Sequence, residues 1–271
     1  MTISLIVSTY NRPDYLSIVL EAVGSQDDQG FELVIADDGS TTETKELIEK
    51  FKSSHSIDVL HIWHEDDGFR KSEILNKSIT AANGDYLVFL DGDCVPRTSY
   101  ISDHRKLARK NRIVGCSRIL LDQTITQHII DNKLQPSKWS LFEFLKLRIS
   151  GHANRILPLI RFPLNAFRNQ TPKRWQKIRG CNFGIYRKEI IKIGGFDESF
   201  TGWGYEDSDL AVRAINSGSL VKRGDYLATV LHLWHSEMPR DEASSNKEKL
   251  NSTISSNRTT SISSPFLDPQ G

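Results

Sequence analysis

Two aspartates, Asp91 and Asp93, stand one glycine apart directly after the apolar run Tyr86–Leu90. Two carboxylates at that spacing, at the end of a buried strand, could hold a divalent cation on a nucleotide diphosphate. They could also belong to a phosphatase whose first aspartate is the nucleophile. Because Asp and Gly both favour turns, a solvated turn after a strand is a third interpretation. The surrounding sequence has to decide among the three.

Three further carboxylates, Glu206, Asp207 and Asp209, follow the motif GWGY and open a predicted helix. Glycines let the backbone approach a ligand closely, and the indole of Trp203 is a flat apolar face on which a sugar ring could stack. The helix dipole favours carboxylates in a first turn, which explains the acids without any function. It does not explain the motif before them, so a sugar-binding segment remains the better interpretation.

Two histidines, His232 and His235, follow apolar residues in the segment TVLHLWH. A single histidine in such a place is usually structural. Two beside a tryptophan, in a chain that already has a strand ending in paired aspartates, favour metal binding.

Strand patterns alternate with helix patterns in the N-terminal third of the chain. The expected strands are ISLIVSTY, FELVIADD, IDVLHIWH and YLVFLDGD, and the expected helices are RPDYLSIVLEAVGSQ, TTETKELIEKFKSS and KSEILNKSITAAN. This alternation predicts an α/β fold with a mostly parallel sheet and helices on both faces, in which ligands bind beyond the carboxyl ends of the strands. One pocket could therefore collect the polar residues at those ends, which are Thr9, Tyr10, Asn11, Asp37, Asp38, Asp91 and Asp93.

The composition bounds the class of protein. The chain has 271 residues, of which 38% are hydrophobic and 25% charged, and its net charge is +1. These values predict a soluble globular protein without overall attraction to nucleic acid. No apolar run reaches the ~20 residues of a membrane span, and no signal-peptide pattern opens the chain. Cys94, Cys116 and Cys181 lack metal-site spacing and suit a reducing compartment, so we expect a cytoplasmic protein.

Two segments differ in character from the rest. Residues 144–179 contain nine Lys or Arg residues and no Asp or Glu, with aromatic residues among them. They could form a solvated face, lie on an anionic membrane surface or hold a phosphate-bearing acceptor, and no nucleic-acid-binding signature accompanies them. Residues 239–271 are polar and rich in serine, which predicts a disordered tail with a short helix near Glu242–Leu250.

Four segments, VSTYNRP, VIADDGS, YLVFLDGDCV and GGFDESFTGWGYEDSDLAVR, resemble the marks of family 2 glycosyltransferases with the GT-A fold. The last is also similar to the galactosyltransferase-type C-terminal segment of β-1,4-galactosyltransferases and chondroitin-synthesising enzymes. The resemblance runs from Ile3 to about Glu237 and implies one domain over residues 1–238, with a Rossmann-like, mostly parallel sheet flanked by helices. It implies metal-dependent, inverting transfer from a nucleotide sugar, with UDP favoured, to a glycan or lipid-linked acceptor in cell-surface polysaccharide synthesis.

The same resemblance implies a donor site. Asp38 would hydrogen-bond the uracil with Asp37 beside it, and Asp91 would meet the ribose or a metal-bound water. Arg70, in HEDDGFRKSEILNKS, would reach the diphosphate or the base, although relatives often carry Arg just before the Asn, where this chain has Leu75. The other residues of the implied donor site are Thr9, Tyr10, Asn11, Gly92 and Trp203.

The implied metal and catalytic residues come from both halves of the chain. Asp93, with Asp91 near it, would bind Mn²⁺ or Mg²⁺, and His235 would be the later ligand, with His232 as the alternative. Asp207 would be the general base, and Glu206 would hold the acceptor or donor sugar. The chemistry agrees, because a divalent ion neutralises charge on a leaving diphosphate and a carboxylate can take the proton of an attacking hydroxyl. A single base opposite the leaving group favours inversion.

Two alternatives stay open beside the resemblance. In a phosphatase, Asp91 would be the nucleophile and Asp93 the acid/base, but that motif normally lies near the start of its fold and ~90 residues precede it here. A non-catalytic nucleotide- or glycan-binding module could share the fold, although Asp93, Asp207 and His235 are all present. The basic segment adds the hypothesis of a peripheral position on the inner face of the membrane.

Overall fold

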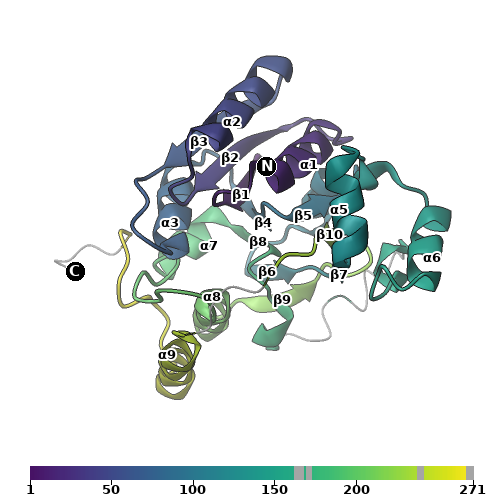
Figure 1. Ribbon diagram of the computed structural model, residues 1–271. Helices are drawn as coiled ribbons and strands as arrows, with labels where there is room; N and C mark the ends of the chain where they lie inside the picture. The colour runs from purple at the N-terminus through teal and green to yellow at the C-terminus, as the bar shows by residue number, and fades with distance from the viewer. Residues whose placement is uncertain (162–167, 169–172, 237–240, 267–271) are drawn as a thin grey trace.

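The computed structural model describes residues 1–161, 168, 173–236 and 241–266, and a seven-stranded sheet forms its centre (Figure 1). The strand order is β3-β2-β1-β4-β8-β6-β9. The first four of these strands are parallel, β8 is antiparallel to both of its neighbours, and β6 is parallel to β9. In that order the strands span Asp58–Trp63, Phe31–Asp37, Ile3–Thr9, Tyr86–Asp91, Asn182–Tyr186, Arg112–Gly115 and Leu220–Arg223.

Helices cover both faces of this sheet. Leu5 and Val7 of β1 pack on the face that helices α1 and α2 cover, whereas Ile6 packs on the face of α3, α7 and α8. Because both faces are buried, the central strands are continuous apolar runs rather than alternating ones. The predicted α/β architecture is therefore confirmed, with β8 as the antiparallel member. The helices span Pro13–Gly24 (α1), Thr42–Ser54 (α2), Lys71–Ala81 (α3), Arg187–Lys192 (α7) and Glu206–Asn216 (α8).

A second, three-stranded sheet continues from the end of β4. Its order is β5-β10-β7, with β10 antiparallel to β5 and parallel to β7. His232, the last residue of β10, pairs with Cys94 of β5 and with Leu120 of β7. This small sheet therefore joins the Asp91–Asp93 turn to the histidine segment. The strands span Cys94–Pro96 (β5), Arg118–Leu120 (β7) and Val230–His232 (β10).

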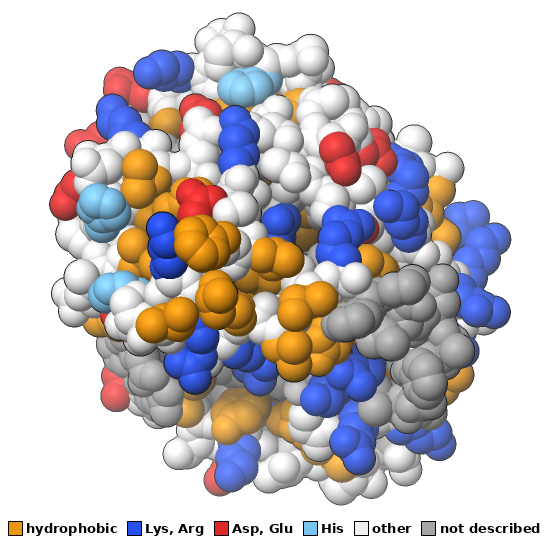
Figure 2. All heavy atoms as spheres, turned by 90° about the vertical axis from the view of Figure 1, so that its right-hand side faces the viewer, with side chains coloured by type: hydrophobic (Ala, Val, Ile, Leu, Met, Phe, Trp, Pro, Cys, Tyr) orange, Lys and Arg blue, Asp and Glu red, His pale blue; other side chains and the backbone are white. Residues whose placement is uncertain are grey.

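The middle of the chain adds three helices and three short turns in the described residues. It contains helices α4 (Tyr100–Leu107), α5 (Gln123–Asp131) and α6 (Leu141–Ile149), with the short 3₁₀ turns η1 (Pro136–Lys138), η2 (Leu157–Leu159) and η4 (Trp175–Lys177). Helix α6 lies at the edge of the molecule, and Figure 2 views that side, where hydrophobic side chains gather among Lys and Arg side chains. The basic segment is described except at residues 162–167 and 169–172. No helix in the described ranges is both long and apolar enough to cross a bilayer.

The serine-rich C-terminal segment forms helix α9, Ala243–Ser256, which packs against α8. The composition predicts disorder beyond a short helix. In the structure, polar side chains make the contacts that hold this segment on the fold. Asn246 and Thr253 are buried, and the Thr253 hydroxyl donates to Asp209 Oδ1 at 2.6 Å. Arg258 follows the helix and lies 3.1 Å from both Asp197 and Asp209. The predicted domain boundary near residue 238 and the last residues, 267–271, lie outside the described residues.

Candidate functional site

The carboxyl ends of β1, β2 and β4 lie side by side. In the parallel register Thr9 pairs with Asp37, and Ser8 pairs with Asp91. The N–H of Gly92 then donates to the carbonyl oxygen of Ser8 at 2.7 Å. A Cβ at Gly92 would lie 2.9 Å from that oxygen, so only glycine allows this approach of two backbones. The sheet therefore brings these strand ends to a single edge.

The adjacent aspartates at the end of β2 are both buried and both bind histidines. Asp37 Oδ2 lies 2.9 Å from His61 Nε2, and Asp38 Oδ1 lies 2.7 Å from His64 Nε2. Asp38 Oδ2 also accepts the N–H of Arg70 at 3.0 Å. Burial raises the pKa of Asp38, and the hydrogen bonds from His64 and Arg70 only partly oppose it. Both carboxylates are thus tied to the segment that begins with β3, through two histidines that no sequence motif singles out.

The loop after β1 is tied to the loops after β2 and β3. Tyr10 is 43% exposed, and its hydroxyl donates to Asp66 Oδ2 at 2.8 Å. Asn11 has a left-handed backbone with φ 48°, and its Oδ1 accepts the N–H of Thr41 at 2.8 Å. Asn tolerates that conformation better than most residues. The three loops therefore form one connected rim around the sheet edge.

Arg70 and Lys71, at the start of α3, have different partners. The Arg70 guanidinium donates to Glu73 Oε2 at 3.3 Å, in the first turn of the helix, and to the carbonyl oxygen of Glu65. The Lys71 ammonium instead lies 2.6 Å from Asp91 Oδ1. Burial alone would lower the pKa of Lys71, but the charges of Asp91 and Glu206 outweigh it and raise that pKa well above its ordinary value. Sequence reasoning names Arg70 and misses Lys71, whose place in the first turn of a helix that begins at the sheet edge was the available signal.

Asp93 faces His232, the last residue of β10, and His235, which follows that strand. Its Oδ2 lies 3.2 Å from His235 Nε2, and its Oδ1 lies 3.6 Å from His232 Nε2. Nδ1 of His235 hydrogen-bonds the carbonyl oxygen of Ser236 at 2.8 Å, which leaves Nε2 to face Asp93. Ligand atoms of Asp93, Cys94 and His232 also lie within 4.8 Å of one another. A carboxylate and two imidazoles that converge in this way fit a divalent transition metal ion such as Mn²⁺.

The ionisation states of this cluster depend on one another. Burial would raise the pKa of Asp93, but the hydrogen bond with His235 and the charge of His232 outweigh it and lower that pKa. Burial lowers the pKa of His232, although Asp93 opposes the shift. The pKa of His235 is raised, chiefly by its hydrogen bond to Asp93. An ionised Asp93 beside a neutral His232 is the state that a cation requires.

Glu206 and Asp207 open α8 after Tyr205, whose φ of 72° is left-handed. Asp207 Oδ2 accepts the N–H of Gly180 at 2.6 Å. Burial first, and then the charge of Asp207, raise the pKa of Glu206 to about 7, while Lys71 opposes the shift. Lys71 therefore connects electrostatically the acid pair of α8 with the carboxylate at the end of β4.

The other members of the GWGYEDSD motif have structural or surface positions. Asp209 is fully buried, and its Oδ2 lies 2.7 Å from Arg213 Nε, so it serves the fold. Trp203 is 41% exposed. Gly202 and Gly204 on either side of it have φ values of 67° and 111°, where glycine is favoured. The motif thus turns the chain so that a partly exposed indole precedes the acid pair.

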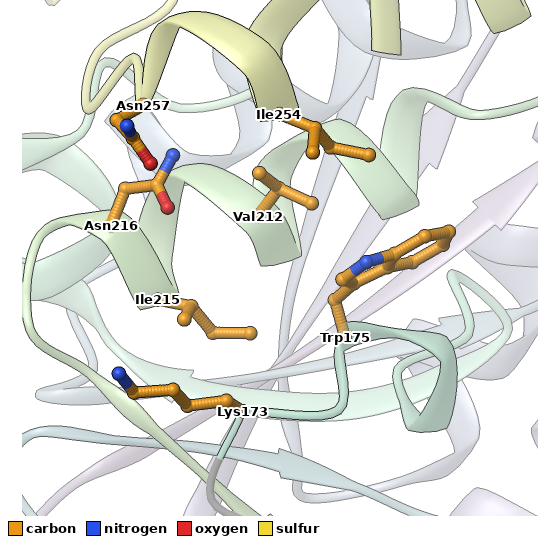
Figure 3. A pocket seen from close by; sticks show the side chains of 7 residues that line it. All are labelled: Lys173, Trp175, Val212, Ile215, Asn216, Ile254 and Asn257. Atoms are coloured by element: carbon orange, nitrogen blue, oxygen red, sulfur yellow. The ribbon is translucent and has the colours of Figure 1, made fainter. Parts of the chain in front are cut away.

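A separate pocket of about 450 Å³ lies between η4, α8 and α9. Figure 3 shows the amides of Asn216 and Asn257 close together, across from Val212, Ile254 and Trp175. None of the sequence-predicted site residues lines it. Its full lining consists of Lys173, Trp175, Val212, Ile215, Asn216, Ile254 and Asn257.

Family models and curated proteins agree on the class of protein that this chain resembles. The model for glycosyl transferase family 2 matches residues 4–192, and the model described as the N-terminal domain of galactosyltransferase matches residues 163–236. The chain is 27% identical over 258 residues to the hyaluronan synthase of Pasteurella multocida, with 91% of the chain and 26% of that protein covered. It is 24% identical over 265 residues to the chondroitin synthase of Escherichia coli, with 89% and 35% covered. The chain thus spans about a quarter to a third of these relatives.

Solved structures share the fold at low sequence identity. S. aureus TarS 1-349 has a TM-score of 0.62 and 16% identity, with 95% of this chain and 65% of that chain covered. The same protein has been solved with UDP and with UDP-GlcNAc. The mannosyltransferase PcManGT from Pyrobaculum calidifontis, in complex with GDP-Man and Mn²⁺, has a TM-score of 0.57 and 18% identity, with 87% and 57% covered. These likenesses confirm the predicted GT-A fold.

Proposed function

Because this chain belongs to glycosyl transferase family 2, we propose that it transfers a sugar from a nucleotide sugar, in the first place a UDP-sugar, to a glycan or lipid-linked acceptor. The transfer would require Mn²⁺ or Mg²⁺, would invert the anomeric configuration and would serve cell-surface polysaccharide synthesis. The names of its relatives, hyaluronan and chondroitin synthase, support a polysaccharide product. The observation that carries the proposal is the sheet edge where Asp93 meets two histidines and Lys71 meets Asp91.

Asp93, His232 and His235 would hold the cation. A divalent ion there would neutralise the charge that develops on the departing diphosphate. One carboxylate with two imidazoles favours Mn²⁺, whereas Mg²⁺ prefers oxygen ligands alone. Asp91, which the Ser8 hydroxyl and Lys71 hold in place, would face the ribose or a water on the cation.

The rim of loops around β1, β2 and β3 would bind the nucleotide. Asp38 would accept a hydrogen bond from the uracil, and the exposed ring of Tyr10 would lie beside the base. Arg70 would support this pocket from α3, since its N–H already binds Asp38. Its guanidinium is engaged by Glu73 and by the carbonyl oxygen of Glu65, so contact with the diphosphate falls more naturally to Lys71. The remaining residues proposed for the donor are Thr9, Asn11, Asp37, Gly92 and Trp203.

Asp207 would act as the general base. One of its oxygens is fixed by the N–H of Gly180, and the positive end of α8 favours its negative charge. Base catalysis of this kind typically contributes ~10²–10⁴-fold. Glu206, with a pKa of about 7, would hold a sugar hydroxyl beside it. A single base opposite the leaving group predicts inversion, and NMR of the product's anomeric proton checks it, with an α-linked product from an α-linked donor as the contrary result.

Asp207→Asn separates the enzyme from a non-catalytic module. A glycosyltransferase should lose turnover by about 10²-fold or more and still bind the nucleotide. Unchanged turnover in this variant would show that Asp207 is not the base. The phosphatase alternative loses its support, because the family match covers the whole of the strand that carries Asp91.

The first experiment is calorimetric titration of the protein with UDP, with and without Mn²⁺. We expect UDP binding that depends on the metal and that Asp93→Ala abolishes, followed by hydrolysis of one UDP-sugar in a screen. If UDP does not bind under either condition while GDP or dTDP binds with the metal, the choice of UDP as the nucleotide is wrong and the assignment of the metal site stands. If none of the three binds, both are wrong.

We also propose a cytoplasmic location without a nucleic-acid partner. Cys94, Cys116 and Cys181 are all free thiols and buried, which suits a reducing compartment. The net charge of +1 offers no general attraction for a polyanion.

A further inference from the structure

Four large apolar side chains are exposed on one side of α6, and we call them the α6 patch. They are Leu141, Phe142, Leu145 and Ile149, with Phe142 64% exposed and Ile149 78% exposed. They are four of the thirteen exposed large apolar side chains of the described residues. Single exposed apolar residues are ordinary, but a contiguous group marks an interaction surface.

The patch is not needed to hold α6 in place. The inner side of the helix already packs, since Phe144 is buried against Trp139 and Leu147 lies on the core. Its start is fixed by a capping box between Ser140 and Glu143. A surface helix normally turns a polar face to solvent, whereas α6 has apolar residues on its outer side as well. The outer apolar residues are therefore available for contacts outside the molecule.

Positive charge surrounds the patch. Lys146 and Arg148, in the last turn of α6, are exposed, and the Lys146 ammonium lies 4.6 Å from the ring centre of Phe142. The one acid between residues 132 and 161 is Glu143, and its carboxylate accepts two hydrogen bonds from Ser140. Figure 2 shows hydrophobic side chains on this side of the molecule with Lys and Arg side chains around them. The basic residues of this stretch are Lys133, Lys138, Lys146, Arg148, Arg155 and Arg161.

We propose that α6 docks this protein on an anionic lipid surface. Phe142, Leu145 and Ile149 enter the boundary between headgroups and acyl chains, while Lys146 and Arg148 bind the headgroups. An apolar face bordered by Lys and Arg is the pattern of a helix that lies in a membrane interface. A second copy of the chain fits less well, because a two-fold interface would place this basic surface against itself.

The residues just after α6 are linked to the candidate metal site through Leu121 and Asp122. The N–H of Leu121, next to β7, donates to the carbonyl oxygen of His232 at 3.0 Å. Leu121 also forms a bridge with Ala153, and Asp122 Oδ2 lies 2.8 Å from His152 Nδ1. Docking would therefore hold the site close to the lipid, where a lipid-linked acceptor can reach it. This consequence depends on the proposed function, whereas docking itself does not.

Co-sedimentation with vesicles tests the docking. The wild-type protein should bind vesicles that contain about one-third phosphatidylglycerol and should bind phosphatidylcholine vesicles weakly. Phe142→Gln with Ile149→Gln should lower the partition coefficient at least about tenfold. Lys146→Gln should lower it roughly fivefold and reduce its dependence on salt. Ile262→Gln is the matched control, because Ile262 is 75% exposed but lies far along the chain in the C-terminal segment.

The other outcomes have definite meanings. The proposal would be overturned if the wild-type protein bound neither kind of vesicle. It would also be overturned if the Phe142/Ile149 variant bound the anionic vesicles as well as the wild type does. A wild-type dimer that this variant converts to a monomer, without vesicle binding, would assign the patch to a second copy. Unchanged UDP binding by the variant shows that it folds. Asp207→Asn should bind vesicles like the wild type, so loss of transfer activity and loss of docking are measured separately.

Discussion

The Lys71 ammonium lies 2.6 Å from Asp91 Oδ1 and thereby joins the start of α3 to the end of β4. The hydroxyl of Ser8 donates to the same oxygen at 2.8 Å. The charge of Lys71 also acts on Glu206 at the start of α8, where it lowers a pKa that burial raises. One ammonium therefore compensates carboxylates on two elements, and it does so at the sheet edge where the proposed donor and acceptor sites meet.

Lys71→Met removes this charge with a side chain of similar length. We expect kcat/KM for the donor to fall about 10²-fold or more, because Asp91 and Glu206 both lose their cation. The pKa of Glu206 should rise further, so the acidic limb of the pH–rate profile moves to higher pH. Kinetics between about pH 5 and pH 9 measure both effects. Lys50→Met, at an exposed position on α2, is the control. If the acidic limb does not move in Lys71→Met, Lys71 has no role in the site.

Glu206→Gln should stabilise the fold at high pH. The pKa of Glu206 is raised from 4.5 to about 7, so the folded protein holds this proton more tightly than the unfolded chain does. The stabilisation is present below the unfolded pKa and is lost as the pH rises through about 7. Glutamine does not ionise, so the variant does not lose this stabilisation. Its free energy of unfolding should exceed that of the wild type by roughly 2–3 kcal/mol near pH 8.

Urea denaturation at two pH values measures this difference. The gap between Glu206→Gln and wild type should close toward about pH 5, where the wild-type carboxyl is protonated. Glu248→Gln on the exposed side of α9 should be neutral at both values. A constant gap at all pH values would show that the substitution acts through packing rather than through charge.

Features set by local pattern are those that the sequence predicts well. The strands that end at Thr9, Asp37 and Asp91 and the helices between them follow from apolar periodicity, and they appear within a few residues of the expected limits. The register of parallel neighbours then brings the strand ends together without further information. The strand pair β5 with β10 places His232 beside Asp93, and His235, just beyond β10, faces the same carboxylate.

Features that depend on long-range contacts are missed. Whether Arg70 or Lys71 faces Asp91 is decided by how α3 crosses the sheet, which no local pattern records. The serine-rich composition predicts only a short helix near Glu242–Leu250 in a disordered tail, whereas α9 continues to Ser256. It is ordered through Thr253 and Arg258, whose partners lie on the α8 side of the fold. In both cases a polar contact between distant segments determines the outcome.

Arg258→Met should destabilise the protein, because Arg258 binds two buried carboxylates. Its Nη1 lies 3.1 Å from Asp197 Oδ2 and its Nη2 lies 3.1 Å from Asp209 Oδ1. Removal of one partner from a buried ion pair leaves uncompensated charge, and we expect a loss of about 2–4 kcal/mol by thermal or urea denaturation. Lys247→Met, at an exposed position on α9, is the control. A loss no larger than in Lys247→Met would mean that the tail packs without contributing to stability.

His232→Ala and His235→Ala separate the two candidate metal ligands. Both Nε2 atoms face Asp93, at 3.6 and 3.2 Å, so each substitution should weaken Mn²⁺ binding to the UDP complex by at least about tenfold. Because a protonated imidazole cannot bind a metal, Mn²⁺ affinity of the wild type should fall as the pH drops through the pKa of His235, which Asp93 raises. Calorimetric titration with Mn²⁺ measures these affinities, and His128→Ala, exposed on α5, is the control. A loss in one variant alone identifies the ligand, and no loss in either would place the cation away from Asp93 and remove the basis of the metal-dependent mechanism.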